Sequence, residues 1–286
     1  MAPSEEEQGY DLMVLAYGPT FLAPDRGDFG YAEVPGYKVA GYGAFLRNHL
    51  DVIERYDQIA LIDDDIETDH RGLARAFELG RAHDLRLWQP SLSWDSYFSH
   101  AALLFHPASA PVRNINFVEM MCPFFKRTAL VEVADLFQIG AETGIDILWS
   151  NVLGEDIGKV AVLDGVSVKH TRPVGTKKIV NGFVDDYSVY IEKLMSEFDM
   201  TYDGVIAPIS PSAEGGNKSV VLTNYIRSVL VGAGFFITPM DKKEFLYRWG
   251  SSLKRLALAN RKISGDRNFI LKRARELAAG TANSGE

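Results

Sequence analysis

Three consecutive aspartates, Asp63, Asp64 and Asp65, directly follow an apolar run at residues 58–62. Adjacent carboxylates repel one another, so the arrangement requires a cation or hydrogen-bond donors to neutralise it. Side chains alternate along an extended segment, so Asp63 and Asp65 are expected to project to one side and Asp64 elsewhere. Such an Asp-x-Asp pair can hold one Mg²⁺ or Mn²⁺, with a diphosphate supplying further ligands. The alternative is a solvated turn whose aspartates cap the helix expected from Asp69.

A histidine at the end of another expected strand is a candidate third ligand. The run at 166–170 ends at His170, and a neutral imidazole suits a transition metal beside carboxylates. A packed or surface histidine is the alternative. The sequence therefore predicts an Mn²⁺ or Mg²⁺ site formed by Asp63, Asp65 and His170.

One carboxylate lies within an apolar stretch. Glu119 stands between Val118 and Met120, a costly place for a charge unless it is hydrogen-bonded or functional. We therefore count Glu119 as a candidate catalytic residue. The alternative is a structural ion pair with Arg113 or Arg127.

Several other side chains are candidates for contact with a substrate. Gln89, Ser91 and Trp94 follow the third expected strand, where a loop can reach sugar hydroxyls and an indole can stack on a sugar; a core position is the alternative for Trp94. Arg113 can make a bidentate contact with phosphate. Lys38, in a glycine-spaced loop, can approach a nucleotide. Neither a P-loop nor a dinucleotide glycine motif occurs in the sequence.

Alternating apolar runs and helical patterns define the elements that must position these residues. Strands are predicted at 11–17, 58–62, 85–88 (ended by Pro90), 116–122 and 160–169. A loop is predicted up to about residue 43, helices at 69–82 and 126–137, and further helices near 184–198, 218–232, 241–261 and 266–279. The pattern predicts an α/β fold with a mostly parallel sheet, helices on both faces and ligands at the carboxyl ends of the strands.

Composition narrows the class of protein. The 286 residues are 47% hydrophobic and carry a net charge of -8, which argues against a general nucleic-acid binder. Cys122 is the only cysteine, which excludes an intramolecular disulfide and favours a reducing compartment. The acidic N-terminus does not resemble a signal peptide, and no apolar stretch approaches the roughly 20 residues that span a bilayer. We expect a cytoplasmic protein.

Four motifs in order carry a resemblance to a known family: YDQIALIDDD at 56–65, QPSL at 89–92, FVEMMCPFF at 117–125 and GID at 144–146. The stretch at 37–170 resembles a plant and bacterial family known only as a domain of unknown function, whose members resemble glycosyltransferases of the Rossmann-like GT-A fold. The family's strand-end motif is usually Asp-Glu-Asp, so Asp64 departs from it at the middle residue. The resemblance fades after residue 175.

The resemblance implies a metal-dependent glycosyltransferase, with a catalytic domain predicted at 1–180. The run of helical patterns after it predicts a helical extension at 181–286 packed on that domain. It implies a UDP- or GDP-sugar donor, with Asp64 among the substrate-binding residues, and a saccharide or lipid-linked acceptor. Asp146 resembles the general base that inverting GT-A enzymes hold at the start of a helix, and Trp149 the nearby aromatic residue of the acceptor site. Capping of the helix N-terminus is the alternative role of Asp146.

Two other functions fit the same residues. A metal-dependent nucleotidyltransferase or phosphohydrolase also uses acidic strand ends, although such sites generally hold two metals and four or more carboxylates and histidines. This sequence has one tight acidic cluster. A non-catalytic nucleotide- or sugar-binding protein is the other alternative.

The C-terminal region has a different charge from the rest of the chain. Residues 241–276 contain eleven Lys and Arg and four Asp and Glu, a net of +7. Phe245, Trp249, Leu253 and Leu256 recur on one stripe of the helix expected there. This pattern predicts peripheral contact with the inner face of a membrane. The alternative is that the stripe packs on the catalytic domain.

Overall fold

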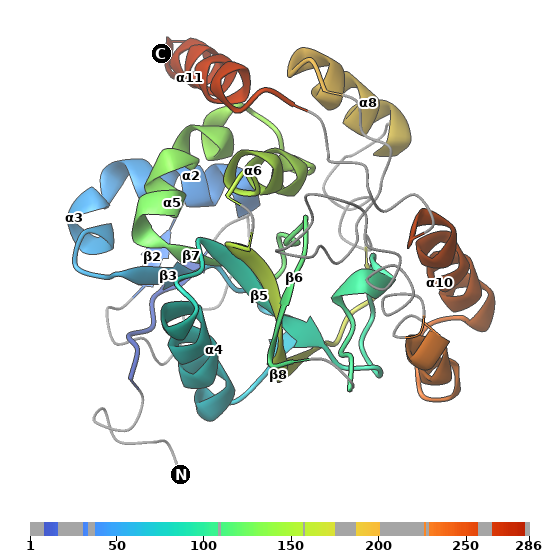
Figure 1. Ribbon diagram of the computed structural model, residues 1–286. Helices are drawn as coiled ribbons and strands as arrows, with labels where there is room; N and C mark the ends of the chain where they lie inside the picture. The colour runs from blue at the N-terminus through green and yellow to red at the C-terminus, as the bar shows by residue number, and fades with distance from the viewer. Residues whose placement is uncertain are drawn as a thin grey trace.

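The computed structural model describes residues 9–16, 31–33, 38–107, 110–156, 158–174, 187–200, 226, 229–256 and 265–283. Within these ranges the chain has a mixed α/β fold, in which helices flank a central sheet (Figure 1). None of the helices in the described ranges combines the length and the apolar character needed to cross a bilayer. Most of the helix predicted at 218–232 lies outside the described residues.

The main sheet has six strands and mixed pairing. Its order is β3 (Gln58–Ala60), β7 (Phe124–Lys126), β5 (Leu87–Leu92), β8 (Val160–His170) and β4 (Ile66–Glu67), and β6 (Val112–Asn114) also pairs with β8. Within it, only β5 and β8 pair in parallel. A separate parallel pair joins β1 (Val14–Ala16) to β2 (Tyr31–Glu33).

The prediction of a mostly parallel sheet is therefore wrong. A parallel neighbour requires a long crossover connection, usually a helix. Between β5 and β7 the only helix in the described residues is a short 3₁₀ helix, η1 (Ala101–Leu103). The chain returns through β6 and β7 as antiparallel neighbours instead.

The helical elements follow the predicted pattern in several places. The helix predicted at 69–82 is α4 (His70–Ala82), capped by the Asp69 side chain, and the one predicted at 126–137 divides into α5 (Arg127–Glu132) and η2 (Ala134–Gln138). The other helical elements are α2 (Lys38–Asn48), α3 (Leu50–Ile53), α6 (Ile145–Leu153), α8 (Tyr187–Glu197), η3 (Gly232–Phe236), α10 (Lys242–Leu256) and α11 (Arg267–Asn283).

Apolar side chains cover both faces of the sheet. Leu87 of β5 and Phe125 of β7 belong to the larger apolar cluster. Their neighbours in sequence, Trp88 and Phe124, belong to the smaller apolar cluster under α4. This alternation is the period-two pattern of a strand. Gly80 allows α4 to approach the sheet, because a Cβ there would lie 2.2 Å from the Trp88 ring. Burial on both faces confirms the predicted α/β layering.

The helix α2 occupies part of the segment that was predicted as a loop. Residues up to about 43 were expected in a loop because of their glycines, but α2 starts at Lys38 and runs through Gly41 and Gly43. A Cβ at Gly43 would lie 2.5 Å from the carbonyl oxygen of Phe137, so this glycine serves close helix packing. The correction places Lys38 in the first turn of a helix.

Two strand predictions also need correction. β5 continues through Pro90 to Leu92, with a change of register between Pro90 and Ser91, so the proline does not end the strand. The strand predicted at 116–122 is irregular. Side chains from other elements satisfy several of its backbone groups, and this shapes the candidate site.

Candidate active site

A lysine neutralises the first aspartate of the acidic motif. Asp63 follows β3 and its N–H donates to the Met121 carbonyl at 2.9 Å. The Lys38 Nζ, from the start of α2, lies 2.9 and 2.7 Å from the two carboxylate oxygens of Asp63 and 3.2 Å from the Met120 carbonyl. Burial raises the pKa of Asp63 above its ordinary value, and the Lys38 charge counters part of that rise.

The third aspartate meets the histidine through strand pairing. β4 pairs antiparallel with β8 and sets Ile66 opposite His170. Asp65 Oδ2 consequently lies 3.4 Å from His170 Nε2 and 3.0 Å from Arg172 Nε. Arg172 also contacts Asp64 Oδ1 at 2.5 Å. Burial acts to raise the pKa of Asp65, but its hydrogen bond to His170 and the nearby positive charges lower it overall.

The histidine ring is held on its other side. His170 is buried, and its Nδ1 lies 3.0 Å from the Tyr97 carbonyl oxygen. A carbonyl only accepts, so Nδ1 donates to it, and the hydrogen bond to the Asp65 carboxylate requires a proton on Nε2 as well. Burial acts to lower the pKa of His170, while Asp65 and the Tyr97 carbonyl raise it overall.

In the irregular segment at 118–121, the backbone groups of Val118 and Glu119 bond to side chains rather than to a neighbouring strand. The Glu119 N–H donates to Gln89 Oε1 at 2.7 Å, and the Val118 N–H donates to Ser150 Oγ at 3.1 Å. The Trp149 indole N–H donates to the Val118 carbonyl at 3.1 Å. Gln89 and Trp149 are fully buried, so the structure gives these two predicted substrate contacts the role of positioning Glu119.

Two carboxyls lie at this segment: the buried Glu119 within it and the partly buried Asp146 beside it. Burial raises the pKa of Glu119 to about 7 and that of Asp146 to about 6, and the Asp146 charge adds to the rise at Glu119. Asp146, in the first turn of α6, accepts from the Ile147 N–H at 3.1 Å and from the backbone of Met120. Ser99 hydrogen-bonds to Glu119. Carboxyls with such pKa values can exchange protons near neutral pH.

Two predicted substrate contacts are used within the protein. Ser91 is fully buried and its hydroxyl donates to the Val166 carbonyl at 3.1 Å. The partly buried Trp94 donates its indole N–H to the Phe105 carbonyl at 2.8 Å. The first bond holds the end of β5 against β8, and the second holds the residues after β5 against the loop after η1.

Arg113 lies in a separate buried network. Its Nε is 2.7 Å from Asp164 Oδ2, and its two terminal nitrogens donate to the carbonyls of Ala102 and Leu104 and to Asp164 Oδ1. Both side chains of the pair are 2% exposed. Arg113 is therefore not presented to a phosphate, and it does not pair with Glu119.

Six sequence-predicted residues come together. Their charges influence one another: Lys38 acts on Asp65 and Asp146, and His170 acts on Glu119. The group is formed by Lys38, Asp63, Asp65, Glu119, Asp146 and His170. Arg172 and Ser99 join it without having been predicted; the position of Arg172, two residues after His170, was the available signal.

The donor atoms of this group fit a divalent cation only in part. Within the described residues, no three His, Cys, Asp or Glu side chains gather as ligands of one ion. Asp63 is paired with Lys38, but Asp65 Oδ1 is buried without a hydrogen-bond partner among the described residues. His170 Nε2 is oriented toward the same carboxylate. Two such ligands suit Mg²⁺ or Mn²⁺ when phosphate oxygens and waters complete the shell.

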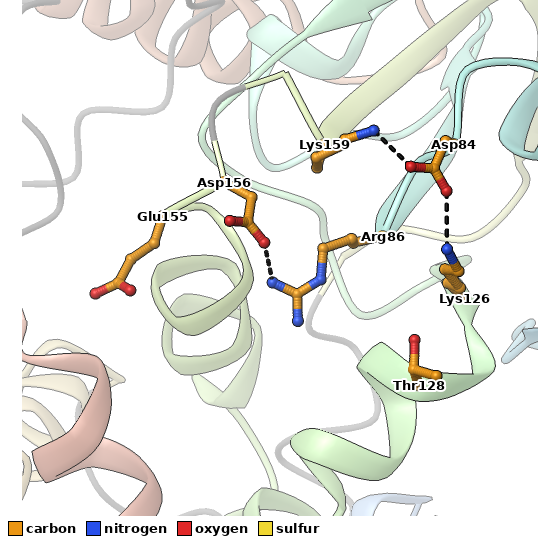
Figure 2. Close-up of a pocket in the computed structure, with 7 residues that line it drawn as sticks. All are labelled: Asp84, Arg86, Lys126, Thr128, Glu155, Asp156 and Lys159. Carbon is orange, nitrogen blue, oxygen red and sulfur yellow. Dashed lines mark hydrogen bonds and ion pairs between the residues drawn. The ribbon is translucent and has the colours of Figure 1, made fainter.

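An open cavity of about 630 Å³ lies away from this group (Figure 2). Asp84 in it lies 2.8 Å from Lys126 Nζ and 2.7 Å from Lys159 Nζ, and Arg86 lies 2.5 Å from Asp156. These partners stand where β5 and β8 begin, whereas ligands of such sheets lie where the strands end. We regard the cavity as an ion-paired junction of strands. It is lined by Asp84, Arg86, Lys126, Thr128, Glu155, Asp156 and Lys159.

Comparisons with protein-family models, curated proteins and solved structures give no match. The inference of function therefore depends on the chemistry of the six converging residues and on the motifs in the sequence.

Proposed function

We propose that this chain is a metal-dependent, GT-A-type glycosyltransferase that moves a sugar from a UDP- or GDP-sugar to a saccharide or lipid-linked acceptor in the cytoplasm. The observation that carries the proposal is the meeting of the acidic motif and His170 with two carboxyls of raised pKa, Glu119 and Asp146. The four ordered sequence motifs support it.

The residues divide into two chemical roles. Asp65 and His170 would hold the cation, and Asp63 would join them on release from Lys38. Bound there, a divalent cation supplies positive charge that offsets the charge gathering on the departing nucleoside diphosphate. Lys38 is a second positive group available to phosphate.

Asp146 accepts the proton of the attacking acceptor hydroxyl, and Glu119 is the second candidate for this role. A base works best when its pKa is close to the working pH, and burial brings both carboxyls toward that range. Glu119 Oε2 has no hydrogen-bond partner among the described residues.

Calorimetric titration with UDP and GDP, with and without Mn²⁺, tests the donor site. Asp63→Ala and Asp65→Ala are expected to abolish cation-dependent nucleotide binding, His170→Ala to weaken it less, and Asp64→Asn to have the mildest effect. Asp84→Ala is the matched control, because Asp84 is an exposed aspartate in the other cavity. Unchanged binding by both alanine variants of the motif would remove the donor-site assignment.

A product assay separates the competing functions. Incubation with UDP- or GDP-sugars and Mn²⁺ is expected to release the nucleoside diphosphate. Release of inorganic phosphate, or of a nucleoside monophosphate, would instead identify a phosphohydrolase or a nucleotidyltransferase. Binding without turnover of either sugar nucleotide would favour the non-catalytic alternative.

A further inference from the structure

Exposed large apolar side chains are concentrated in one part of the described chain. Of the twelve such residues in the described ranges, seven fall between residues 226 and 247. Phe236 and Tyr247 are the most exposed of all, at 83% and 77%. A gathering of exposed apolar groups on a folded protein marks an interaction site more often than scattered single residues do. The seven are Ile226, Val229, Leu230, Phe236, Ile237, Leu246 and Tyr247.

The inward stripe of α10 is already used by the core. Phe245 is fully buried, and its ring lies edge-on to Phe98 at 5.6 Å and close to Phe235 at 6.0 Å. A Cβ at Gly232 would lie 2.7 Å from the Trp249 ring, so η3 packs directly on that side chain. Phe245 and Trp249 of the predicted stripe therefore pack on the protein, and the exposed apolar groups belong to other faces.

The exposed groups of η3 and α10 form one surface. Lys242 Nζ contacts the Phe235 carbonyl at 2.5 Å and lies 5.0 Å from the Phe235 ring centroid, so the start of α10 borders η3. Leu246 stands one turn after Lys242 on the same flank. We use the name η3–α10 surface for the exposed residues of these two adjoining elements, Phe236, Ile237, Lys242, Lys243, Leu246 and Tyr247. Figure 1 places α10 on the far side of the molecule from α2 and α3.

Charge around this surface is positive. Residues 241–256 contain five Lys and Arg and two Asp and Glu, while the whole chain carries -8. Both acids have local partners: Asp241 accepts the N–H groups of Lys243 and Glu244, and Glu244 pairs with Arg248 at 2.6 Å. Lys242 and Lys243 are exposed. An anionic surface would therefore attract this end of the molecule and repel the acidic remainder.

We propose that the η3–α10 surface docks on an anionic lipid bilayer. Phe236 and Ile237 enter the headgroup and acyl boundary, while Lys242 and Lys243 meet the lipid phosphates. Aromatic and aliphatic groups beside lysines are the features that hold peripheral helices on such bilayers. A symmetric pair of copies is the less favourable occupant, because a two-fold interface uses the same patch twice and would bring the lysines of both copies together.

Flotation of the intact chain with lipid vesicles tests the proposal. Vesicles of phosphatidylcholine with phosphatidylglycerol are expected to carry the protein upward, and vesicles of phosphatidylcholine alone are not. Binding to anionic vesicles should fall on the order of tenfold as the salt concentration rises from 0.05 to 0.5 M, because salt screens the surface charges. A chain that stays at the bottom with anionic vesicles at both salt concentrations overturns the proposal.

Surface variants locate the contact without disturbing the core. Phe236→Ser with Ile237→Ser, and separately Lys242→Glu with Lys243→Glu, should each weaken binding to anionic vesicles by about tenfold or more. Phe269→Ser and Lys272→Glu are the matched controls, because they change exposed residues of α11 and should leave binding unchanged. Melting temperatures close to that of the parent chain verify the fold of every variant.

Two outcomes on these variants contradict the proposal. Equal loss of binding in the η3–α10 and α11 variants would mean that the contact is not specific to this surface. Light scattering that finds a dimer, converted to a monomer by Phe236→Ser, would assign the surface to a second copy of the chain.

Discussion

Two groups of buried charges in this molecule are arranged in opposite ways. At the first, Arg113 and Asp164 pair at 2.7 Å, and carbonyls and a backbone N–H occupy their remaining hydrogen-bonding positions. At the second, both groups are acids, Glu119 and Asp146, and the charge of Asp146 raises the pKa of Glu119. Glu119 Oε2 has no hydrogen-bond partner among the described residues. The first group is complete within the protein, whereas the second is not.

The difference separates structural from functional burial of charge. A buried charge is costly unless a partner and hydrogen bonds compensate it. The Arg113 pair meets that condition and joins β6 to β8. The charges of Glu119 and Asp146 are not fully compensated, so the pKa values of both carboxyls are raised. Raised pKa values of this kind are found frequently at active sites.

The largest expected effect comes from breaking the complete pair. Arg113→Met leaves Asp164 as an uncompensated buried charge and should lower the free energy of unfolding by about 3–5 kcal/mol. Urea denaturation at pH 7 measures this change. Arg75→Met, which breaks an exposed pair with Glu78, should change stability by no more than about 0.5 kcal/mol. If Arg113→Met lowers the free energy of unfolding by less than about 1 kcal/mol, the Arg113–Asp164 pair does not stabilise the fold as proposed.

Removing the carboxylate charge of Glu119 should stabilise the protein at alkaline pH. The pKa of Glu119 rises from 4.5 to about 7 on folding. Its contribution to the free energy of unfolding is therefore fully present below pH 4.5 and is lost as the pH rises through 7. Glu119→Gln avoids that loss. Its stability relative to the parent should therefore increase by about 3 kcal/mol between pH 4.5 and pH 8.

Thermal or urea unfolding at several pH values, without nucleotide, tests the Glu119 prediction. Glu78→Gln is the control, because Glu78 is exposed on α4 and should follow the pH profile of the parent. If the stability of Glu119→Gln follows the same pH dependence as that of the parent, ionisation of Glu119 does not destabilise the folded state.

Asp146→Asn should separate binding from transfer. The variant keeps the size of the side chain and should bind the sugar nucleotide normally. It should transfer sugar more slowly by a factor on the order of 10² through loss of a general base. Donor hydrolysis and transfer must be measured separately. Normal transfer by Asp146→Asn together with loss in Glu119→Gln would assign the base to Glu119.

The smallest expected effect concerns the lysine that contacts Asp63. Lys38→Met frees both carboxylate oxygens of Asp63 and should increase the affinity for Mn²⁺ by about tenfold, which corresponds to about 1.4 kcal/mol. Calorimetric titration of Mn²⁺ measures this directly. Lys242→Met, an exposed lysine on α10, is the control. Weaker binding of Mn²⁺ by Lys38→Met would show that Lys38 supports the cation site rather than competing with it.

The sequence predicted the elements whose signals are local. The period of apolar residues indicated α4 and β8, and Asp69 was expected near the start of α4. The direction of strand pairing could not be predicted in this way, because it depends on how the segment between β5 and β7 returns to the sheet. The mostly parallel sheet was a wrong prediction for that reason.

The candidate site was predictable in residue type but not in contacts. A run of acids and a histidine at strand ends are visible in the sequence, and the structure brings them together. The partner of each acid comes from a distant segment: Lys38 from α2 and Arg172 from beyond β8. Gln89 and Trp149 have the composition of ligand contacts, but the fold buries both against the 118–121 segment.

The way in which that segment is held has an evolutionary consequence. A strand ladder is made of backbone groups and tolerates many side chains, but the amides of Val118 and Glu119 depend on the particular side chains of Gln89 and Ser150. Substitution at either residue can re-aim Glu119 while the register of the sheet stays the same. Natural variation at positions 89 and 150 thus offers a route by which related chains could diverge in specificity without refolding the scaffold.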